Sequence, residues 1–237
     1  MKLSAPIYRL KRVARRMART ENIPLHLALN RVAIEEGFES WSLLAARFAT
    51  LTPAGRLFAR LTPGDLLLLG ARPGHGKTLL SLELAVEAMK SGHRGVFFTL
   101  EETERAVLER LRAIGAEPAR LARLFTLDSS DAISADHIMM TLQAAPRGTT
   151  AIVDYLQALD QKRENPPLMV QISALRRFAR EKGLILIFIS QIDRSYDPLA
   201  KPCPDIGDIR LPNPLDLSLF SKTCFLNNGD MRFQAMN

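Results

Sequence analysis

The chain has 237 residues, of which 47% are hydrophobic and 24% charged, and this balance excludes a disordered or fibrous protein. Its two cysteines, Cys203 and Cys224, form no CxxC pair, so no disulfide framework or structural zinc site is indicated. A cytoplasmic location is expected, and no apolar run is long enough to predict a membrane span. The formal net charge is +7, and residues 1–20 hold seven basic and no acidic residues, so the excess belongs to the N-terminal end.

Residues 1 to about 50 predict a small unit of three helices. Between residues 7 and 17, apolar side chains recur at helical spacing and cations fill the other faces, as in a basic amphipathic helix. A second helical pattern starts near Pro24 and ends at Gly37, and a third follows Ser40, the expected N-cap. An arginine-rich, acid-free start is also typical of a mitochondrial presequence, so the location stays provisional.

Two interpretations of this unit stay open. Ala33, Gly37 and Leu43 have the spacing of a helix-turn-helix, in which a small residue lets two helices cross, glycine makes the turn and an aliphatic side chain closes the corner. The alternative is a helical hairpin that docks on the next domain through Trp41 and Phe48. The basic first helix would contact nucleic-acid phosphates under the first interpretation, and an anionic membrane surface is a further alternative for it.

From residue 57 onward, short apolar runs alternate with longer amphipathic helices. The expected strands lie at 66–70, 95–100, 124–127, 149–154 and 184–190, and the expected helices at 77–91, 102–114, 134–144 and 167–182. This alternation predicts an α/β fold with a mostly parallel central sheet that is flanked by helices and binds ligands at the carboxyl ends of its strands. The proline- and glycine-rich segment between the two parts predicts a connector, so we expect two domains, at residues 1–52 and 57–237.

The segment ARPGHGKT follows the first expected strand and matches the phosphate-loop pattern, with alanine at the position of the first glycine. Gly74 and Gly76 let the backbone direct successive amide N–H groups at a phosphate, and the following helix adds the positive end of its dipole. Lys77 is expected to reach the β- and γ-phosphate oxygens, and Thr78 to bind Mg²⁺. The predicted nucleotide site consists of Arg72, Pro73, Gly74, His75, Gly76, Lys77 and Thr78.

Acidic residues follow two further expected strands. A carboxylate at Glu101 would face the γ-phosphate and polarise the attacking water, although Glu101, Glu102 and Glu104 equally suit the start of a helix, whose dipole they complement. Asp154 ends an apolar strand, where an acid is explained as an outer ligand of the Mg²⁺ held by Thr78.

The last expected strand leads into a long, proline-rich loop at about residues 193–214. Gln191, at the end of this strand, is placed to sense the γ-phosphate by hydrogen bonding and to relay its loss into the loop. Loops of this length inside a compact domain are usually functional or mobile. The loop carries three cations that are candidate DNA-binding residues or part of a solvated surface: Arg194, Lys201 and Arg210.

These strand ends resemble those of the RecA-like ATPase domain of the DnaB-type replicative helicases, or superfamily 4. The motifs that carry the resemblance are, in the family's order, ARPGHGKT (71–78), TLE (99–101), VDYLQ (153–157), SQIDRS (190–195) and DIR (208–210). The resemblance implies a RecA-like P-loop NTPase fold, with Mg²⁺ held by Thr78 and Asp154. It further implies Lys77 on the phosphates, Glu101 as the residue that activates water and Gln191 as the coupling residue.

The function implied by the resemblance is a Mg²⁺-dependent DNA helicase or DNA-dependent ATPase that acts on single-stranded DNA. Its partners would be ATP, single-stranded DNA near the 193–210 loop and further copies of the chain, with a hexameric ring as one form. The sequence departs from the family in its N-terminal residues, in the segment after Arg210 and in lacking a Lys-x-Arg arginine finger, since Arg232 is the only late arginine. The alternative function is therefore a nucleotide-gated RecA-like binding or assembly module with little unwinding.

Overall fold

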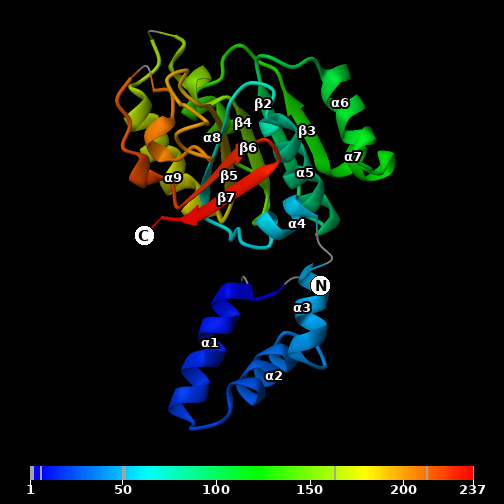
Figure 1. The fold of residues 1–237 in the computed structure, drawn as a ribbon. Helices are drawn as coiled ribbons and strands as arrows, with labels where there is room; N and C mark the ends of the chain where they lie inside the picture. Colours follow the sequence, from blue (N-terminus) through cyan, green and yellow to red (C-terminus); the bar gives the residue numbers. More distant parts are fainter. Residues whose placement is uncertain (1–2, 6, 50–51, 163, 212, 237) are drawn as a thin grey trace. The chain divides into compact units, whose positions relative to one another are not determined.

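The structure is a computed structural model, and it describes residues 3–5, 7–49, 52–162, 164–211 and 213–236. The chain divides into two compact units, Met1–Thr62 and Pro63–Asn237 (Figure 1). No helix in the described ranges combines the length and the apolar composition needed to cross a membrane.

The first unit contains the three predicted helices and one more. Its elements are α1 (Ile7–Thr20), α2 (Leu25–Glu35), α3 (Trp41–Ala49) and α4 (Pro53–Phe58). Ser40 caps α3 as predicted, because its hydroxyl oxygen accepts a hydrogen bond from the Leu43 amide at 3.3 Å. The segment predicted as a connector folds locally into α4, which begins after Thr52, whose hydroxyl accepts from the Gly55 amide at 3.0 Å.

A small apolar core holds the first three helices together. It is formed by Leu10, Ala14, Ala28, Val32, Ala33 and Leu44. Gly37 has φ +81° after α2, as its predicted turn requires. The predicted helix-turn-helix corner is wrong at Leu43, which is 50% exposed, whereas Leu44 is 1% exposed and enters the core. Trp41 packs against this core, and docking of the unit through Trp41 and Phe48 stays a prediction because the Phe48 side chain lies outside the described residues.

The second unit is built on a seven-stranded sheet with the order β3-β2-β4-β5-β1-β6-β7. Its strands are β1 (Leu66–Ala71), β2 (Gly95–Thr99), β3 (Phe125–Asp128), β4 (Thr150–Asp154), β5 (Ile185–Gln191), β6 (Lys222–Asn227) and β7 (Asp230–Ala235). Neighbouring strands are parallel except for β6 and β7, which form an antiparallel hairpin. The mostly parallel sheet is therefore as predicted, and β6 and β7 extend it beyond the five predicted strands.

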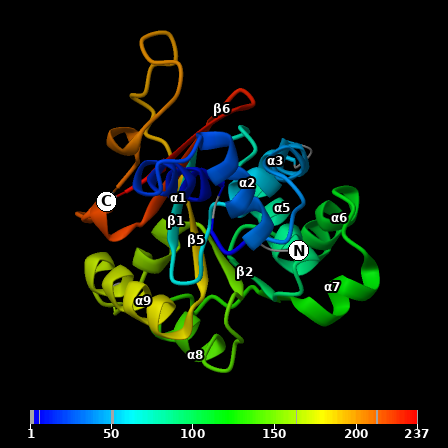
Figure 2. The same cartoon turned by 90° about the horizontal axis from the view of Figure 1, so that it is seen from below.

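Helices cover both faces of this sheet, as a parallel sheet requires (Figure 2). The helices are α5 (Lys77–Lys90), α6 (Glu104–Ala113), α7 (Pro118–Leu124), α8 (Ala135–Thr141) and α9 (Leu168–Lys182), with short 3₁₀ turns η1 (Leu156–Asp160), η2 (Ile206–Asp208) and η3 (Leu217–Leu219). One face packs on α5, with α6 and α7 beside it, and the other packs on α8 and α9. Four of these helices match predicted ones, and α7 was not predicted.

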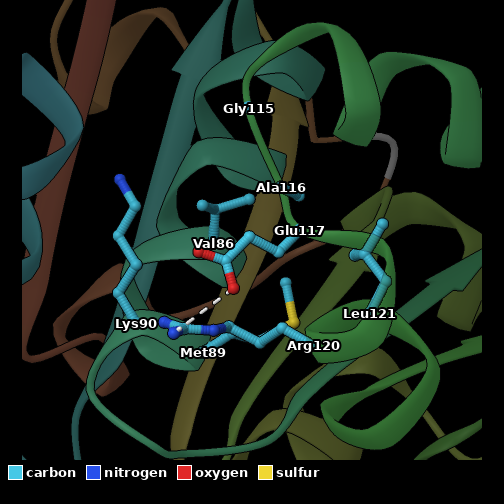
Figure 3. Close-up of a pocket in the computed structure, with 8 residues that line it drawn as sticks. All are labelled: Val86, Met89, Lys90, Gly115, Ala116, Glu117, Arg120 and Leu121. Carbon is cyan, nitrogen blue, oxygen red and sulfur yellow. Dashed lines mark ion pairs between the residues drawn. The ribbon is translucent and has the colours of Figure 1, made fainter.

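A small pocket lies between the end of α5 and the start of α7 (Figure 3). Its volume is about 30 Å³, comparable to one water molecule. Glu117 and Arg120, which line it, form an ion pair at 3.6 Å. Because the pocket contacts α5 near Lys90, at the end opposite to the phosphate loop, and because it is so small, it marks a packing defect between helices and not a ligand site.

Candidate nucleotide-binding site

The phosphate loop joins β1 to α5, the strand–loop–helix context that the motif needs. Gly74 and Gly76 have φ +81° and +83°, in the left-handed region that side chains disfavour, and Gly76 is the N-cap of α5. A Cβ atom added at either glycine would meet no heavy atom within 4 Å. Backbone conformation, and not crowding, therefore requires these glycines.

Thr78 and Asp154 form an oxygen-lined position beside the start of α5. The Thr78 hydroxyl donates to one carboxylate oxygen, Oδ2, of Asp154 at 3.5 Å. Asp154 is only 1% exposed, and its other oxygen, Oδ1, has no hydrogen-bond partner among the described residues. A hydroxyl and a buried, partly unpartnered carboxylate fit Mg²⁺, which takes few protein oxygens and completes its shell with phosphate oxygens and water. Bound there, Mg²⁺ would supply positive charge next to the phosphates of the nucleotide.

The electrostatic surroundings of Asp154 locate two more predicted residues. The pKa of Asp154 is raised to about 6, first by burial and then by the nearby Glu101 carboxylate, while the Lys77 ammonium opposes both effects. Lys77, Thr78, Glu101 and Asp154 therefore lie together at the carboxyl edge of the sheet. Because the site carries more negative charge than Lys77 balances, it favours a bound cation.

The three glutamates after β2 have different surroundings in the structure. The Thr99 hydroxyl accepts hydrogen bonds from the amides of Glu101 and Glu102, at 3.1 and 3.2 Å, which fixes the turn. Glu104 starts α6, and the Glu102 carboxylate pairs with Arg110 at 3.0 Å. The Glu101 side chain is exposed, and no described residue forms an ion pair with it. The helix-start role therefore falls on Glu104, and Glu101 keeps a free carboxylate near the phosphate position.

The loop after β5 is closed at its base by backbone hydrogen bonds. The Asp193 amide donates to the Asp208 carbonyl at 2.7 Å, and the Arg210 amide donates to the Gln191 carbonyl at 2.9 Å. Ile192 and Ile209 form an antiparallel bridge between these two bonds. The loop therefore starts and ends at the carboxyl end of β5, and the backbone of Gln191 is joined to both of its ends.

A pocket of about 490 Å³ lies between the phosphate loop and the base of this loop. It is lined by Arg72, Pro73, His75, Gln191, Ile192, Arg194 and Arg210. All of these except Ile192 are predicted site residues, so the structure brings the start of the phosphate loop, the residue predicted to couple the two sites and two candidate DNA contacts to one cavity. Lys201 does not line it, because its ammonium pairs with Asp205 at 2.6 Å and with Asp208 at 2.7 Å.

Gln157 is a site residue to which the sequence analysis assigned no role. Its side-chain amide donates to the Ser190 hydroxyl at 3.2 Å and to the Arg210 carbonyl at 2.6 Å. It therefore ties the turn after β4 to the end of β5 and to the base of the loop. The only signal in the sequence was its place in VDYLQ, three residues after Asp154, and its contact with Arg210 is made across 53 residues.

A mostly parallel sheet with a phosphate loop after β1, a buried acid at the end of β4 and a glutamate after β2 defines a RecA-like P-loop ATPase. Residues 57–202 match the sequence model of the family described as "ATPase: KaiC". The chain belongs to this KaiC-type ATPase family.

The sequence of this chain is similar to those of DnaB-type replicative helicases. The replicative DNA helicase DnaB of Leifsonia xyli subsp. xyli (strain CTCB07) is 26% identical in an alignment of 181 residues, and the match covers 63% of this chain and 40% of that protein. The chain thus spans about 40% of the length of the curated relatives it matches. The resemblance to the ATPase domain of DnaB-type helicases, predicted from the strand ends, is confirmed.

Solved structures share the fold. A DnaB-like replicative helicase, solved together with an account of its interactions with primase, superimposes with a TM-score of 0.56 at 18% identity, covering 92% of this chain and 66% of that one. The KaiC-like protein PH0186 from Pyrococcus horikoshii OT3 superimposes with a TM-score of 0.54 at 16% identity, covering 76% of this chain and 82% of that one. The predicted RecA-like fold of the second unit is confirmed.

Proposed function

We propose that this chain binds ATP with Mg²⁺, hydrolyses it and acts on single-stranded DNA as a DnaB-like helicase or DNA-dependent ATPase. The observation that carries the proposal is the convergence of Lys77, Thr78, Glu101 and Asp154 at the carboxyl edge of the sheet. These residues supply a cation for the phosphates, two oxygen ligands for Mg²⁺ and a free carboxylate, the parts that phosphoryl transfer to water requires.

In this proposal each residue of the site has a distinct role in binding the nucleotide or in hydrolysing it. The phosphate loop, residues 72–78, orients the triphosphate, and Lys77 stabilises charge on the β- and γ-phosphate oxygens. Thr78 and Asp154 hold Mg²⁺. Glu101 accepts a hydrogen bond from the attacking water and polarises it, since Glu102 is engaged by Arg110.

The pocket beside the phosphate loop supports a link between nucleotide and DNA. Gln191 lies in this pocket and at the root of the loop, so a contact with the γ-phosphate would bias the position of Arg194 and Arg210. We propose these two arginines, and not Lys201, as the main DNA contacts of the loop, because two carboxylates already compensate the Lys201 charge. Assembly of several copies into a ring and a cytoplasmic location belong to the same proposal.

Glu101→Gln tests the catalytic assignment against Glu102→Gln as a matched control. We expect Glu101→Gln to lower the kcat of ATP hydrolysis by about a hundredfold or more, because an amide no longer accepts the proton of the water. ATP binding should persist in this variant. Glu102→Gln removes a carboxylate that pairs with Arg110 and acts on Asp154 less than Glu101 does, so it should change kcat by less than about tenfold. Equal losses in the two variants, measured by phosphate release, would remove Glu101 from this role.

A further inference from the structure

One face of α1 carries six exposed cationic side chains: Arg9, Lys11, Arg12, Arg15, Arg16 and Arg19. At about 100° per residue, they cover roughly 160° of the helix circumference and about 15 Å of its length. The opposite face holds Leu10 and Ala14, which are buried in the core of the first unit. These six side chains are called the basic face of α1 below.

The charge of this face is not balanced within the protein. The helix contains no acidic residue, and in the described part of the chain no carboxylate forms an ion pair with the basic face. By contrast, Arg31 of α2 pairs with Glu21 at 2.5 Å. Residues 63–237 contain 21 basic and 21 acidic residues, so the net charge of +7 lies entirely in residues 1–62. The basic face therefore creates a local positive potential that favours a polyanionic partner.

A membrane surface suits this helix less well than a polyanion does. An interfacial helix binds a bilayer by burying its apolar face among the lipids. In α1 that face is already used, because Leu10 is 4% and Ala14 0% exposed against the core formed with α2 and α3. Among the side chains of α1 that the structure describes, all the exposed ones except Thr20 belong to the basic face.

The α2–α3 pair also suits nucleic acid less well than α1 does. The exposed position of Leu43 removes the corner contact that a helix-turn-helix needs. Arg31, the cation of α2, is already paired with Glu21. Five of the six cations of the basic face are arginines, whose planar guanidinium groups match phosphate oxygens with two parallel hydrogen bonds.

We propose that the basic face of α1 binds the phosphate backbone of nucleic acid without sequence preference, as a second site separate from the loop after β5. The site needs no nucleotide and no ATP hydrolysis, so it does not depend on the proposed function. Contact with four to six phosphates of a duplex would give a slope of log affinity against log salt of about −4 to −5.

The test measures fluorescence anisotropy of labelled duplex and single-stranded DNA with the full chain, without nucleotide, across a series of KCl concentrations. The variant combines Arg12→Gln, Arg16→Gln and Arg19→Gln, which are exposed, so its melting temperature should match the wild type. The control combines Arg105→Gln, Arg112→Gln and Arg177→Gln, three exposed arginines of α6 and α9 that remove the same charge.

We expect the α1 variant to bind duplex DNA at least tenfold more weakly at low salt, with a slope shallower by about 2.7 at 0.9 per phosphate. The single-stranded arm should change in the same direction by a smaller amount, about 0.7 per phosphate. The control should keep the wild-type affinity and slope. Unchanged binding in the α1 variant, or an equal loss in the control, would overturn the proposal, as would binding to phosphatidylserine vesicles without binding to DNA.

A Lys77→Ala arm separates this proposal from the proposed function. Lys77 lies in the phosphate loop of the second unit, so this variant should lose ATP hydrolysis and keep DNA binding by α1. If the chain proved to have no ATPase activity, the α1 measurement would still stand. If Lys77→Ala abolished DNA binding in the absence of nucleotide, the basic face of α1 would not be an independent site.

Discussion

Lys77→Ala is expected to lower the rate of ATP hydrolysis by about a hundredfold or more, because the Lys77 ammonium lies near Asp154 and, in the proposed mechanism, stabilises charge on the phosphate oxygens. The ammonium of Lys77 opposes the negative charge of Glu101 and Asp154 in the free protein. Its removal leaves the triphosphate facing two carboxylates, so ATP binding should weaken as well. Phosphate release and binding of a fluorescent ATP analogue measure the two effects.

The matched control for this prediction is Lys90→Ala at the other end of α5. Lys90 is exposed and pairs with Glu87 at 2.8 Å, so its loss removes a lysine from the same helix without touching the site. Hydrolysis by Lys90→Ala should stay within about twofold of the wild type, since exposed ion pairs contribute little. A Lys77→Ala protein that is as active as Lys90→Ala would show that the phosphate loop is not the catalytic site.

Asp154→Asn is expected to stabilise the nucleotide-free protein while lowering Mg²⁺-dependent hydrolysis by tenfold to about a hundredfold. The pKa of Asp154 is raised from 3.8 to about 6, chiefly by burial, so ionising this group costs the folded state roughly 3 kcal/mol near neutral pH. Asparagine keeps the shape of the side chain without the charge. The melting temperature of the second unit should therefore rise by about 6 °C or more.

The stability gained by Asp154→Asn should depend on pH, and it should be larger at neutral than at acidic pH. A carboxyl group whose pKa is raised on folding costs stability in full above about pH 6, and this cost fades as the pH falls from 6 through 3.8, below which both states are protonated. The advantage of Asp154→Asn should thus shrink to about half between roughly pH 7.5 and 5. Asp131→Asn, an exposed acid, serves as the control and should show no such change. A destabilised Asp154→Asn protein would show that the Asp154 carboxylate stabilises the fold and does not serve as a cation ligand.

The strand ends that form the site could be predicted because local signals agree with the fold around them. Continuous apolar runs predicted β1 and β4, and a buried acid directly after such a run, Asp154, points to a ligand in any parallel sheet. The assignment of Glu101 to water activation came from the family resemblance, because position alone suited Glu101, Glu102 and Glu104 equally to the start of a helix. The ion pair that Arg110 forms with Glu102 from the next helix could not be predicted from the sequence.

The hairpin at the end of the sheet shows where local signals are weaker. Strand β6 begins with Lys222, and a lysine is expected at the protein surface. In the structure Lys222 is only 3% exposed, and its ammonium pairs with Asp65, 157 residues earlier in the chain. In the turn after β6, which was not predicted, Asn228 and Gly229 both have positive φ, +49° and +89°, as a two-residue hairpin turn needs. Strand β7, which was not predicted, shows the alternating exposure that is typical of an edge strand.

The charged residues could be counted from the sequence, but the ion pairs that they form could not be predicted from it. Lys201 was grouped with Arg194 and Arg210 as a DNA contact, although two carboxylates of its own loop, Asp205 and Asp208, hold its ammonium. Spacing within an irregular loop does not determine such contacts, since they depend on the closure of the loop at its base.

The measurement that tests the central claim most directly is the steady-state rate of ATP hydrolysis by the wild-type chain with and without single-stranded DNA, with the mass of the complex determined in the presence of nucleotide. The proposed coupling through Gln191 and the loop predicts a faster rate with DNA and a multimeric complex with ATP. Arg210→Ala should reduce this stimulation, whereas Arg177→Ala, exposed on α9, should leave it intact. A hydrolysis rate that single-stranded DNA does not change would contradict the account and favour a nucleotide-gated module.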